Sequence, residues 1–155
     1  MKYQSPLFAV SDLERSKAFY KKYLDMDVIV DFGANVTLTG GLSLQTLETW
    51  REFIGGVEVR FKGNACEIYF EEDDFDEFLQ KIDGLELVHP PLEHRWGQRV
   101  VRFYDPDGHI IEVGENLSAV TRRFADSGMS TSEIAVRMDV REEYVKEWLG
   151  LGYDI

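Results

Sequence analysis

The clearest hydrophobic pattern in the chain lies between residues 99 and 113, where two runs rich in Val, Ile, Phe and Tyr flank the turn sequence Asp105-Pro106-Asp107-Gly108. Proline fixes φ at the second position of such a turn, and glycine accepts the left-handed conformation that ends it. The pattern therefore predicts a β-hairpin. If the turn is type I with a bulge at the glycine, His109 pairs with Asp105 and Glu112 lies opposite Arg102.

Alternation along the two strands gives this hairpin one apolar face and one mixed face. The apolar face is predicted to join the core. The mixed face carries a carboxylate and an arginine among apolar residues, which suits the floor of a ligand pocket, although an ion pair on a solvated sheet face gives the same pattern. The apolar face consists of Val101, Phe103, Ile111 and Val113, and the mixed face of Val100, Arg102, Tyr104, Ile110 and Glu112.

The N-terminal part of the chain predicts a strand, a helix and three further strands. Residues 5–11 alternate like a strand, and Ser11-Asp12-Leu13-Glu14 is typical of a helix start, with Ser11 or Asp12 as the cap. Apolar residues at helical spacing continue to about Leu24. Strands at 28–32, 35–39 and 42–47 complete this order. A helical turn is expected at 50–54, and residues 57–61 alternate like a further strand whose place in the sheet the pattern leaves open.

The same order of elements then recurs, which is the main argument for the fold. A strand at 65–70 precedes a helix that begins at Asp73-Asp74 and stops at Gly84, and strands at 85–88, 99–104 and 109–113 follow. The paired prolines of the segment 90–97 predict irregular structure there, so His89 and His94 are placed in a loop. The predicted fold is α+β, with two β-α-β-β-β modules in residues 1–115.

From about residue 116 the strand pattern ends, and residues 116–155 are predicted to form a helical C-terminal extension. Helices are expected at 118–125, 131–138 and 141–149, and residues 124–135 resemble the opening of a helix-turn-helix. We expect these helices to cover apolar surface as a lid or a dimer contact. The side chains expected to do so are Phe124, Ile134, Val145, Trp148 and Leu149.

Composition narrows the classes of partner. The formal net charge of −12 disfavours nucleic acid and anionic membranes, and the last predicted helix has more acids than bases. No long apolar run or secretory signal is present, so a soluble, cytoplasmic protein is expected.

The single cysteine, Cys66, excludes an internal disulfide and is predicted to be a packed thiol. The acidic run at 71–77 is more typical of a helix start than of a cation site.

The repeated module and the sequence from Phe103 to Glu112 resemble the vicinal oxygen chelate superfamily, which includes glyoxalase I, bleomycin-resistance proteins, fosfomycin-modifying enzymes and extradiol dioxygenases. Residues 8–24 look like the opening strand and helix of that family, and the resemblance covers about residues 4–115. It implies curved sheets that form a cleft, a divalent metal held by four strands, and a homodimer. Its metal positions fall on Ser5, Gln45, Glu67 and Glu112, so both usual histidines are absent.

This set of residues is a weak metal site on chemical grounds. Serine is a poor ligand at neutral pH, and two carboxylates with one amide oxygen suit Mg²⁺ or Mn²⁺ better than Zn²⁺ or Fe²⁺. Arg102 beside Glu112 would also neutralise charge that a metal needs. We therefore expect no cofactor, with a divalent metal held by Gln45, Glu67 and Glu112 as the alternative.

Three functions remain open from the sequence. The first is a metal-independent module that binds a small polar or cationic aromatic molecule, because aromatic rings and carboxylates attract cations. The second is a metal-dependent lyase or isomerase like glyoxalase I, and the third is a ligand-sensing regulator that acts through its C-terminal helices. The candidate catalytic residues are Glu67 and Glu112, and the candidate ligand-binding residues are Gln45, Tyr69, Trp96, Arg102 and Tyr104.

Overall fold

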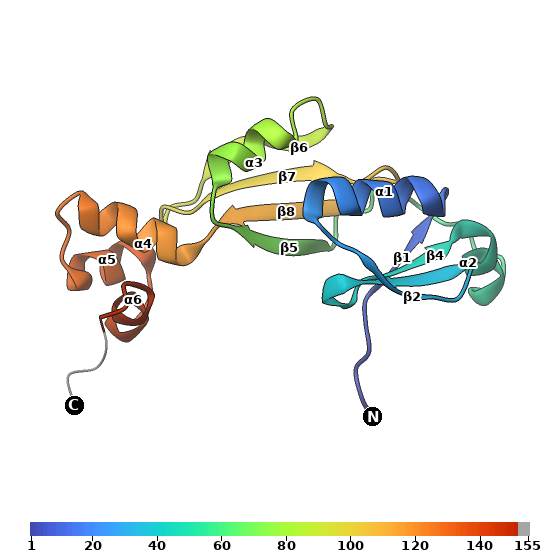
Figure 1. Cartoon of the computed structure of the whole chain (residues 1–155), viewed down its shortest axis with the longest axis horizontal. Helices are drawn as coiled ribbons and strands as arrows, with labels where there is room; N and C mark the ends of the chain where they lie inside the picture. The colour runs from blue at the N-terminus through green and yellow to red at the C-terminus, as the bar shows by residue number, and fades with distance from the viewer. Residues whose placement is uncertain (152–155) are drawn as a thin grey trace. The chain divides into compact units, whose positions relative to one another are not determined.

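The computed structural model describes residues 1–151, and these divide into two compact units. The first unit contains Met1–Glu67 together with Tyr104–Ile110, and the second contains Ile68–Phe103 and the chain from Ile111 onward. Each unit is organised around one four-stranded sheet (Figure 1). The predicted α+β fold with two β-α-β-β-β modules is confirmed.

The sheet of the first unit has the order β1-β4-β3-β2. Its parallel pair joins β1 (Leu7–Val10) to β4 (Ser43–Thr46), with Leu7 opposite Ser43. The strands β3 (Asn35–Leu38) and β2 (Val28–Asp31) extend the sheet in antiparallel fashion, so that β2 lies at an edge. A short 3₁₀ turn (Thr39–Gly41) precedes β4, and helix α2 (Leu47–Phe53) follows it in place of the shorter helical turn expected at 50–54.

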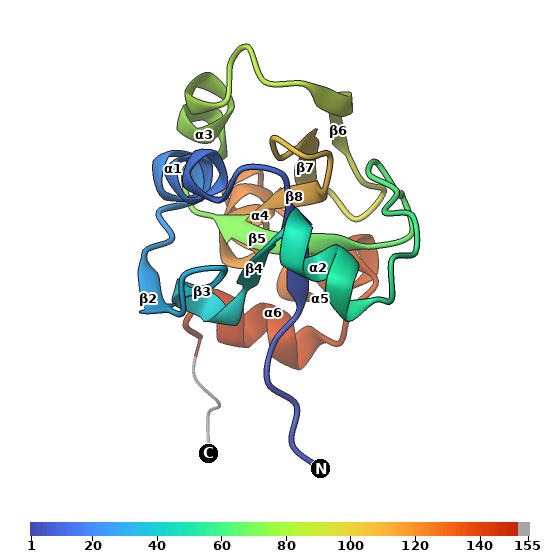
Figure 2. The same ribbon diagram turned by 90° about the vertical axis from the view of Figure 1, so that its right-hand side faces the viewer.

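Helix α1 (Leu13–Leu24) covers one face of this sheet (Figure 2). Asp12 caps it, since its Oδ1 accepts a hydrogen bond from the Arg15 amide at 2.9 Å. This carboxylate satisfies one of the free N–H groups of the first turn, as the sequence predicted. The core beneath α1 is apolar and completely closed to solvent at Val10, Tyr20, Val36, Leu38 and Leu44.

Two predictions for the end of the first unit are wrong. Residues 57–61 do not form a strand, and Val57 is 64% exposed. Alternation alone does not make a strand, because an isolated strand leaves its backbone groups unpaired unless a sheet edge receives it. Cys66 is exposed and precedes the strand that begins at Glu67, so it is not the packed thiol expected from its apolar neighbours.

A buried carboxylate closes the predicted turn at residues 105–108. The amide of Gly108 donates to the Asp105 carbonyl at 3.0 Å, and the amide of Asp105 donates to the His109 carbonyl at 3.0 Å, which confirms the predicted pairing. The Asp105 Oδ1 accepts from the amides of Asp107 and His109, each at 2.9 Å. Its Oδ2 accepts from the Tyr20 hydroxyl at 2.9 Å and lies 2.8 Å from His109 Nδ1, so one side chain ties the turn to α1.

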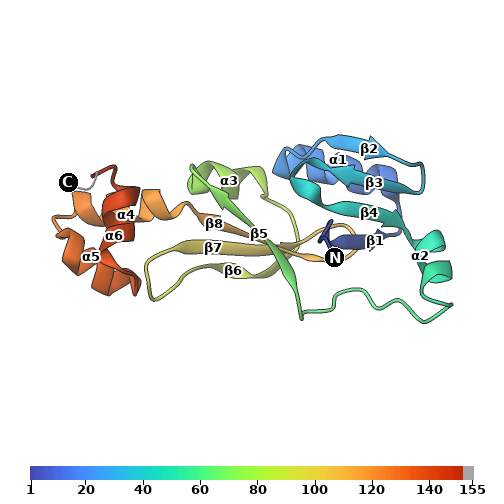
Figure 3. The ribbon, with the colours of Figure 1, turned by 90° about the horizontal axis from the view of Figure 1, so that it is seen from below.

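The sheet of the second unit has the order β5-β8-β7-β6. Its strands are β5 (Glu67–Glu72), β6 (Leu87–Glu93), β7 (Arg99–Tyr104) and β8 (Ile110–Glu115), and Figure 3 shows the last three side by side. Helix α3 (Phe75–Lys81) begins at Asp74, whose Oδ1 accepts from the Glu77 amide at 2.9 Å. Asp74 therefore caps α3 as Asp12 caps α1, and the acidic run includes this cap.

Strand β6 contains the two prolines for which irregular structure was predicted, so this prediction is wrong. The strand lies at the edge of the sheet, and its register with β7 shifts between Leu87 and His89 and again between His89 and Leu92. Proline lacks an amide hydrogen and is accepted in a sheet where no partner needs that donor, at edges and bulges. His89 consequently belongs to a strand and not to a loop.

Helix α3 packs on the face of the hairpin that the sequence assigned to the core. Val101, Phe103 and Ile111 are fully buried, and the rings of Phe78 and Phe103 lie 6.0 Å apart between centroids. The opposite side of these strands therefore carries the mixed face. Alternation placed each of these residues correctly because the period of a strand is two.

The C-terminal extension forms three helices: α4 (Leu117–Asp126), α5 (Thr131–Met138) and α6 (Glu142–Trp148). They enclose a small core of their own at Val120, Ile134, Ala135, Met138 and Val145. Ile134 and Val145, expected to cover other apolar surface, are fully buried inside this cluster. Across residues 1–151, none of the helices combines the length and the apolar composition that crossing a membrane would require.

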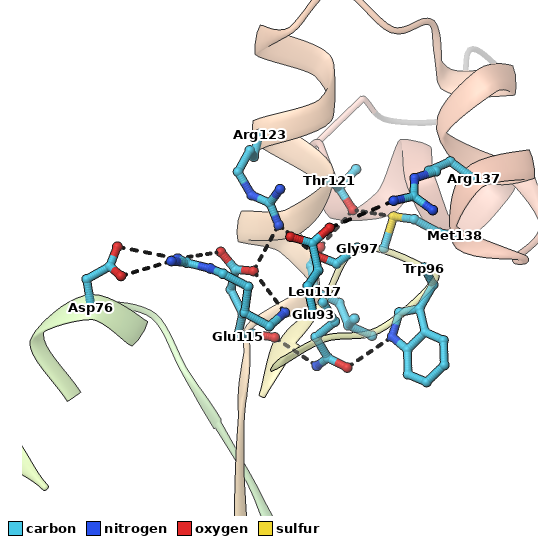
Figure 4. A network of polar contacts seen from close by, with 12 residues as sticks. Asp76, Glu93, Trp96, Gly97, Glu115, Leu117, Thr121, Arg123, Arg137 and Met138 are labelled. Carbon is cyan, nitrogen blue, oxygen red and sulfur yellow. Dashed lines mark hydrogen bonds and ion pairs between the residues drawn. The ribbon is translucent and has the colours of Figure 1, made fainter. Parts of the chain in front are cut away.

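Glu115, at the end of β8, joins the extension to the second sheet (Figure 4). Its carboxylate accepts from Arg99 at 3.0 Å and from Arg123 of α4 at 3.1 Å, and Arg123 also donates to the Gly97 carbonyl at 2.6 Å. Burial by itself would raise the pKa of Glu115, but the hydrogen bonds from Arg99 and the charge of Arg123 hold that pKa below its ordinary value. Arg99 reaches Asp76 of α3 at 2.8 Å as well.

We expect Asp105→Asn to destabilise the fold by roughly 1–3 kcal/mol near neutral pH, because buried partners lose a charged acceptor. Burial acts to raise the Asp105 pKa, but hydrogen bonds and the charge of His109 lower it overall. The ionised carboxylate therefore stabilises the folded state above the unfolded pKa of about 4, and this contribution disappears as the pH falls through the lower folded pKa. Urea unfolding over a pH series should show the gap between the two proteins narrowing in acid.

The exposed Asp83→Asn change is the control for that series, and it should leave the free energy of unfolding nearly unchanged at every pH. A gap for Asp105→Asn that stays constant down to strongly acidic pH would contradict a stabilising role for its ionised form.

Gly97→Ala should destabilise the protein more than Gly128→Ala does. Both glycines have φ near +90°, so each substitution carries a backbone cost of about 1 kcal/mol. A Cβ at Gly97 would also overlap the Phe124 ring of α4, whereas a Cβ at Gly128 meets nothing within 4 Å. Overpacking adds about 1–3 kcal/mol at Gly97, and thermal unfolding with limited proteolysis of the extension would measure it. Equal losses would show that α4 is not held against this turn.

Candidate functional site

The mixed face of the second sheet has a buried ion pair at its centre. Arg102 of β7 contacts Glu112 of β8 through Nη2 and Oε2, which agrees with the predicted placement of the two residues opposite one another. The Glu112 side chain is only 8% exposed, whereas that of Arg102 is 22% exposed. An unpaired carboxylate at such a depth would be costly, so the arginine is required by the burial of the glutamate.

His89 of β6 extends this pair across a third strand. Its Cα is the ladder partner of Arg102, and its Nε2 lies 3.5 Å from Arg102 Nη1. His89 Nδ1 is 2.7 Å from the Pro90 carbonyl oxygen, which can only accept, so Nδ1 carries a proton and donates. In the neutral ring, Nε2 then presents its lone pair toward the guanidinium. Sequence reasoning missed His89 because the adjacent prolines placed it in a loop.

Tyr69 of β5 lies on the same face of the sheet. A Cβ built on Gly114, which shares the face of Glu112, would lie 3.1 Å from the Tyr69 ring and 2.9 Å from Gln98 Nε2. The missing side chain of Gly114 therefore leaves space for these two groups. Tyr69 as a whole is 48% exposed, and its hydroxyl accepts from Gln98 Nε2 at 2.9 Å and donates to Glu71 at 3.1 Å. Burial raises the Tyr69 pKa most, the hydrogen bond from Gln98 lowers it and Glu71 raises it again, so the pKa lies above its ordinary value.

Trp96 lies where the β6–β7 hairpin meets the C-terminal extension. Its indole N–H donates to Gln98 Oε1 at 3.1 Å, its ring stacks on His94 at 4.1 Å, and it packs against the core cluster of the extension. A crevice of about 240 Å³ beside it is lined by Trp96, Gln98, Leu117, Met138, Val140 and Trp148. Trp96 is thus placed with the helices, and its predicted part in ligand binding stays a prediction.

The candidate residues of the first unit have partners within that unit. Gln45 is buried, its Oε1 accepts from Asn35 at 2.8 Å and its Nε2 donates to the Thr49 hydroxyl. The hydroxyls of Ser5 and Ser43 are 3.0 Å apart. Glu67 is exposed at the start of β5, and Lys62 Nζ lies 4.8 Å from the centre of the Tyr104 ring.

These side chains do not fit a divalent ion well. Glu112 is engaged by a guanidinium, and both ends of the Gln45 amide are used by neighbours in its own unit. In the part of the chain that the structure describes, no three side chains of His, Cys, Asp or Glu form a group that could hold a metal ion. The positively charged group beside Glu112 is the guanidinium of Arg102.

Known proteins resemble the two-module part of this chain. A family model described as a glyoxalase-like domain matches residues 3–118. The metallothiol transferase FosB of Staphylococcus epidermidis is 29% identical over 108 residues, which cover 68% of this chain and 75% of that relative. FosB of Staphylococcus saprophyticus is 27% identical over 109 residues, which cover 68% and 71%. The match to the family ends within the first turn of α4.

Solved structures match a similar share of this chain. A protein of unknown function from Agrobacterium tumefaciens is 38% identical, with a TM-score of 0.66 over 75% of this chain and 94% of that one. A glyoxalase/bleomycin resistance protein/dioxygenase family enzyme from Burkholderia phytofirmans shares the fold at 17% identity, with a TM-score of 0.62 over 72% and 96%. Helices α5 and α6 follow the segment that matches the family.

A double-mutant cycle would test the buried pair. We expect Arg102→Leu to cost about 2 kcal/mol of unfolding free energy, because Glu112 would keep a buried charge without its cation, while the partial exposure of Arg102 moderates the loss. The double change Arg102→Leu with Glu112→Leu should recover most of it, as measured by urea unfolding.

The exposed pair of Lys21 and Asp25, 2.8 Å apart on the surface of α1, is the matched control. Its coupling energy should not exceed about 0.5 kcal/mol. Additive losses at Arg102 and Glu112 would mean that the two charges do not stabilise one another.

Proposed function

The chain belongs to the glyoxalase-like domain family, and on this premise we propose that it binds a small organic molecule on the mixed face of its second sheet, with Arg102 at the centre and without a metal ion. The observation that carries the proposal is the buried Arg102–Glu112 pair. Arg102 and Glu112 lie on the sheet face opposite helix α3, and removing their charges from water costs free energy. A role in ligand binding would explain why the protein keeps a charged pair there.

The surroundings of the pair support binding of an organic ligand. Tyr69 exposes about half of its surface on the same face, and its hydroxyl is held by Gln98 and Glu71. A held aromatic ring gives contact area with little loss of side-chain entropy. Ligand sites combine such apolar area with a few fixed polar groups, and this face offers both.

A second candidate is a metal-dependent enzyme, either a transferase or a lyase of the glyoxalase I type. The observation in its favour is that the relatives from two Staphylococcus species are named metallothiol transferases. The donor groups argue against it, because Arg102 engages Glu112 and the Gln45 amide is used by its neighbours. In the metal-dependent case Glu112 would have to exchange its arginine for the ion.

Elemental analysis separates the two candidates. Protein purified without chelators should contain far less than one equivalent of any divalent metal, and its thermal midpoint should be unchanged by EDTA, since no ion contributes to the folded state. A metal content near one equivalent that Glu112→Gln abolishes would replace the proposal with the enzyme.

A thermal-shift screen of small organic molecules tests binding itself. A ligand at about 100 times its Kd should raise the free energy of unfolding by about 2.7 kcal/mol, which is roughly 5–10 °C for a protein of this size. The shift should be lost in the double variant Arg102→Leu with Glu112→Leu, and kept in Tyr144→Ala, an exposed change on α6. Hits that keep their full shift in the double variant would place the ligand elsewhere.

A further inference from the structure

We propose that Arg102 acts as a fixed cation on the second sheet and that the ligand is an aromatic molecule carrying one oxyanion, either a carboxylate or a phosphonate. This inference rests on the proposed function and adds the chemical class of the ligand. It also assigns to a protein side chain the role that the vicinal oxygen chelate resemblance would give to a metal ion. Four features of the described residues support it.

The first feature is the charge that the face presents. Glu112 is almost completely buried and its carboxylate is in contact with Arg102, so its negative charge is compensated from within the sheet. The expectation of a cationic ligand relied on aromatic rings together with carboxylates, and the charge of Glu112 is engaged by Arg102. Arg102 is the member of the pair that keeps more surface, 22% against 8% for Glu112. The guanidinium is therefore the more accessible group of the pair.

The second feature is the orientation of the guanidinium. Glu112 holds it from β8, and His89 Nε2 lies 3.5 Å from Nη1 on the side of β6. The His89 ring is itself oriented by its hydrogen bond to the Pro90 carbonyl at 2.7 Å. Because neighbours on both flanking strands hold the group, its planar donors are oriented before a ligand arrives, and little side-chain entropy remains to be lost. His89 acts here as a positioning residue.

The third feature is the match between guanidinium and oxyanion. Arginine presents N–H groups in a planar fork that fits the two oxygens of a carboxylate or a phosphonate. It keeps its charge throughout the physiological pH range, as a divalent ion would. A cation fixed in a partly desolvated setting attracts an oxyanion more strongly than an exposed lysine does.

The fourth feature is the aromatic surface on the same face. Tyr69 lies over Gly114, two residues from Glu112 along β8, and the residue exposes about half of its surface. Its hydroxyl is fixed at both of its hydrogen-bonding functions, to Gln98 and to Glu71. The ring face is therefore the part of Tyr69 that a ligand can use, and aromatic rings prefer offset or edge-on contact with another ring. The ligand thus combines a ring with an oxyanion.

The test uses four probes that share a ring and differ in charge: benzoate, phenylphosphonate, neutral benzamide and cationic benzylammonium. Binding to the full chain is measured by calorimetry at low ionic strength with EDTA present. We expect benzoate and phenylphosphonate to bind at least about tenfold more tightly than benzamide, and benzylammonium to bind more weakly than benzamide. The ratio between the two anions tells which oxyanion the site prefers.

Variants then assign the effect to Arg102. Arg102→Gln should weaken benzoate at least about tenfold and remove the preference over benzamide, whereas Arg102→Lys should keep the preference for anions with weaker binding. The control is Arg60→Gln, which removes one positive charge from a side chain that is 86% exposed and should leave all affinities unchanged. Thermal unfolding of each variant shows whether a loss reflects unfolding, and Arg102→Lys keeps the test valid if Arg102→Gln does not fold.

Each other outcome has a defined meaning. Preferential binding of benzylammonium that Glu112→Gln abolishes would overturn the oxyanion ligand and leave small-molecule binding on this face standing. Affinities that fall equally in Arg102→Gln and Arg60→Gln would mean a general charge effect, and binding that requires an added divalent ion would return the role to a metal. If no probe binds, the oxyanion inference fails, and the thermal-shift screen still decides the proposed function.

Discussion

A carboxylate buried within a β-strand must have a cation beside it, and the second unit is built around this requirement. Glu112 lies on β8, one of the two inner strands of its sheet, and the other inner strand, β7, supplies Arg102. A shift of one residue between β7 and β8 would separate the two charges and turn the apolar residues Val101 and Ile111 toward solvent. The ion pair and the apolar face therefore both require the same register between β7 and β8. The turn that begins at Asp105 sets this register.

The elements that depend on local chemistry could be predicted from the sequence. Asp12 and Asp74 cap helices because a carboxylate at that position accepts an amide hydrogen of the first turn, whatever the rest of the chain does. The turn at residues 105–108 follows from proline and glycine in the same way. The three C-terminal helices also lie close to their predicted bounds, since their starts and ends are set by nearby residues.

The elements that depend on a neighbour in the sheet could not be predicted in this way. Residues 57–61 alternate like a strand but have no strand beside them, while residues 87–93 contain two prolines and still form an edge strand. The same limit affects the site. Arg102 and Glu112 belong to one hairpin and their contact follows from its turn, but His89 joins them only because β6 pairs with β7. Tyr69 likewise reaches their face through the space left by Gly114 on the adjacent strand.

Gln98 shows why a polar ligand is better placed at Arg102 than at the end of the sheet near the extension. Its amide nitrogen donates to the Tyr69 hydroxyl and to the Glu115 carbonyl, and its oxygen accepts from the Trp96 indole. The Glu115 carboxylate is in turn engaged by Arg99 and Arg123, which attach α4. These groups are buried or half-buried and already satisfied, so a ligand there would have to break a structural hydrogen bond for each one it gained. The proposed ligand would meet at Arg102 a guanidinium that is 22% exposed and is oriented by Glu112 and His89, and binding there would leave the attachment of the extension intact.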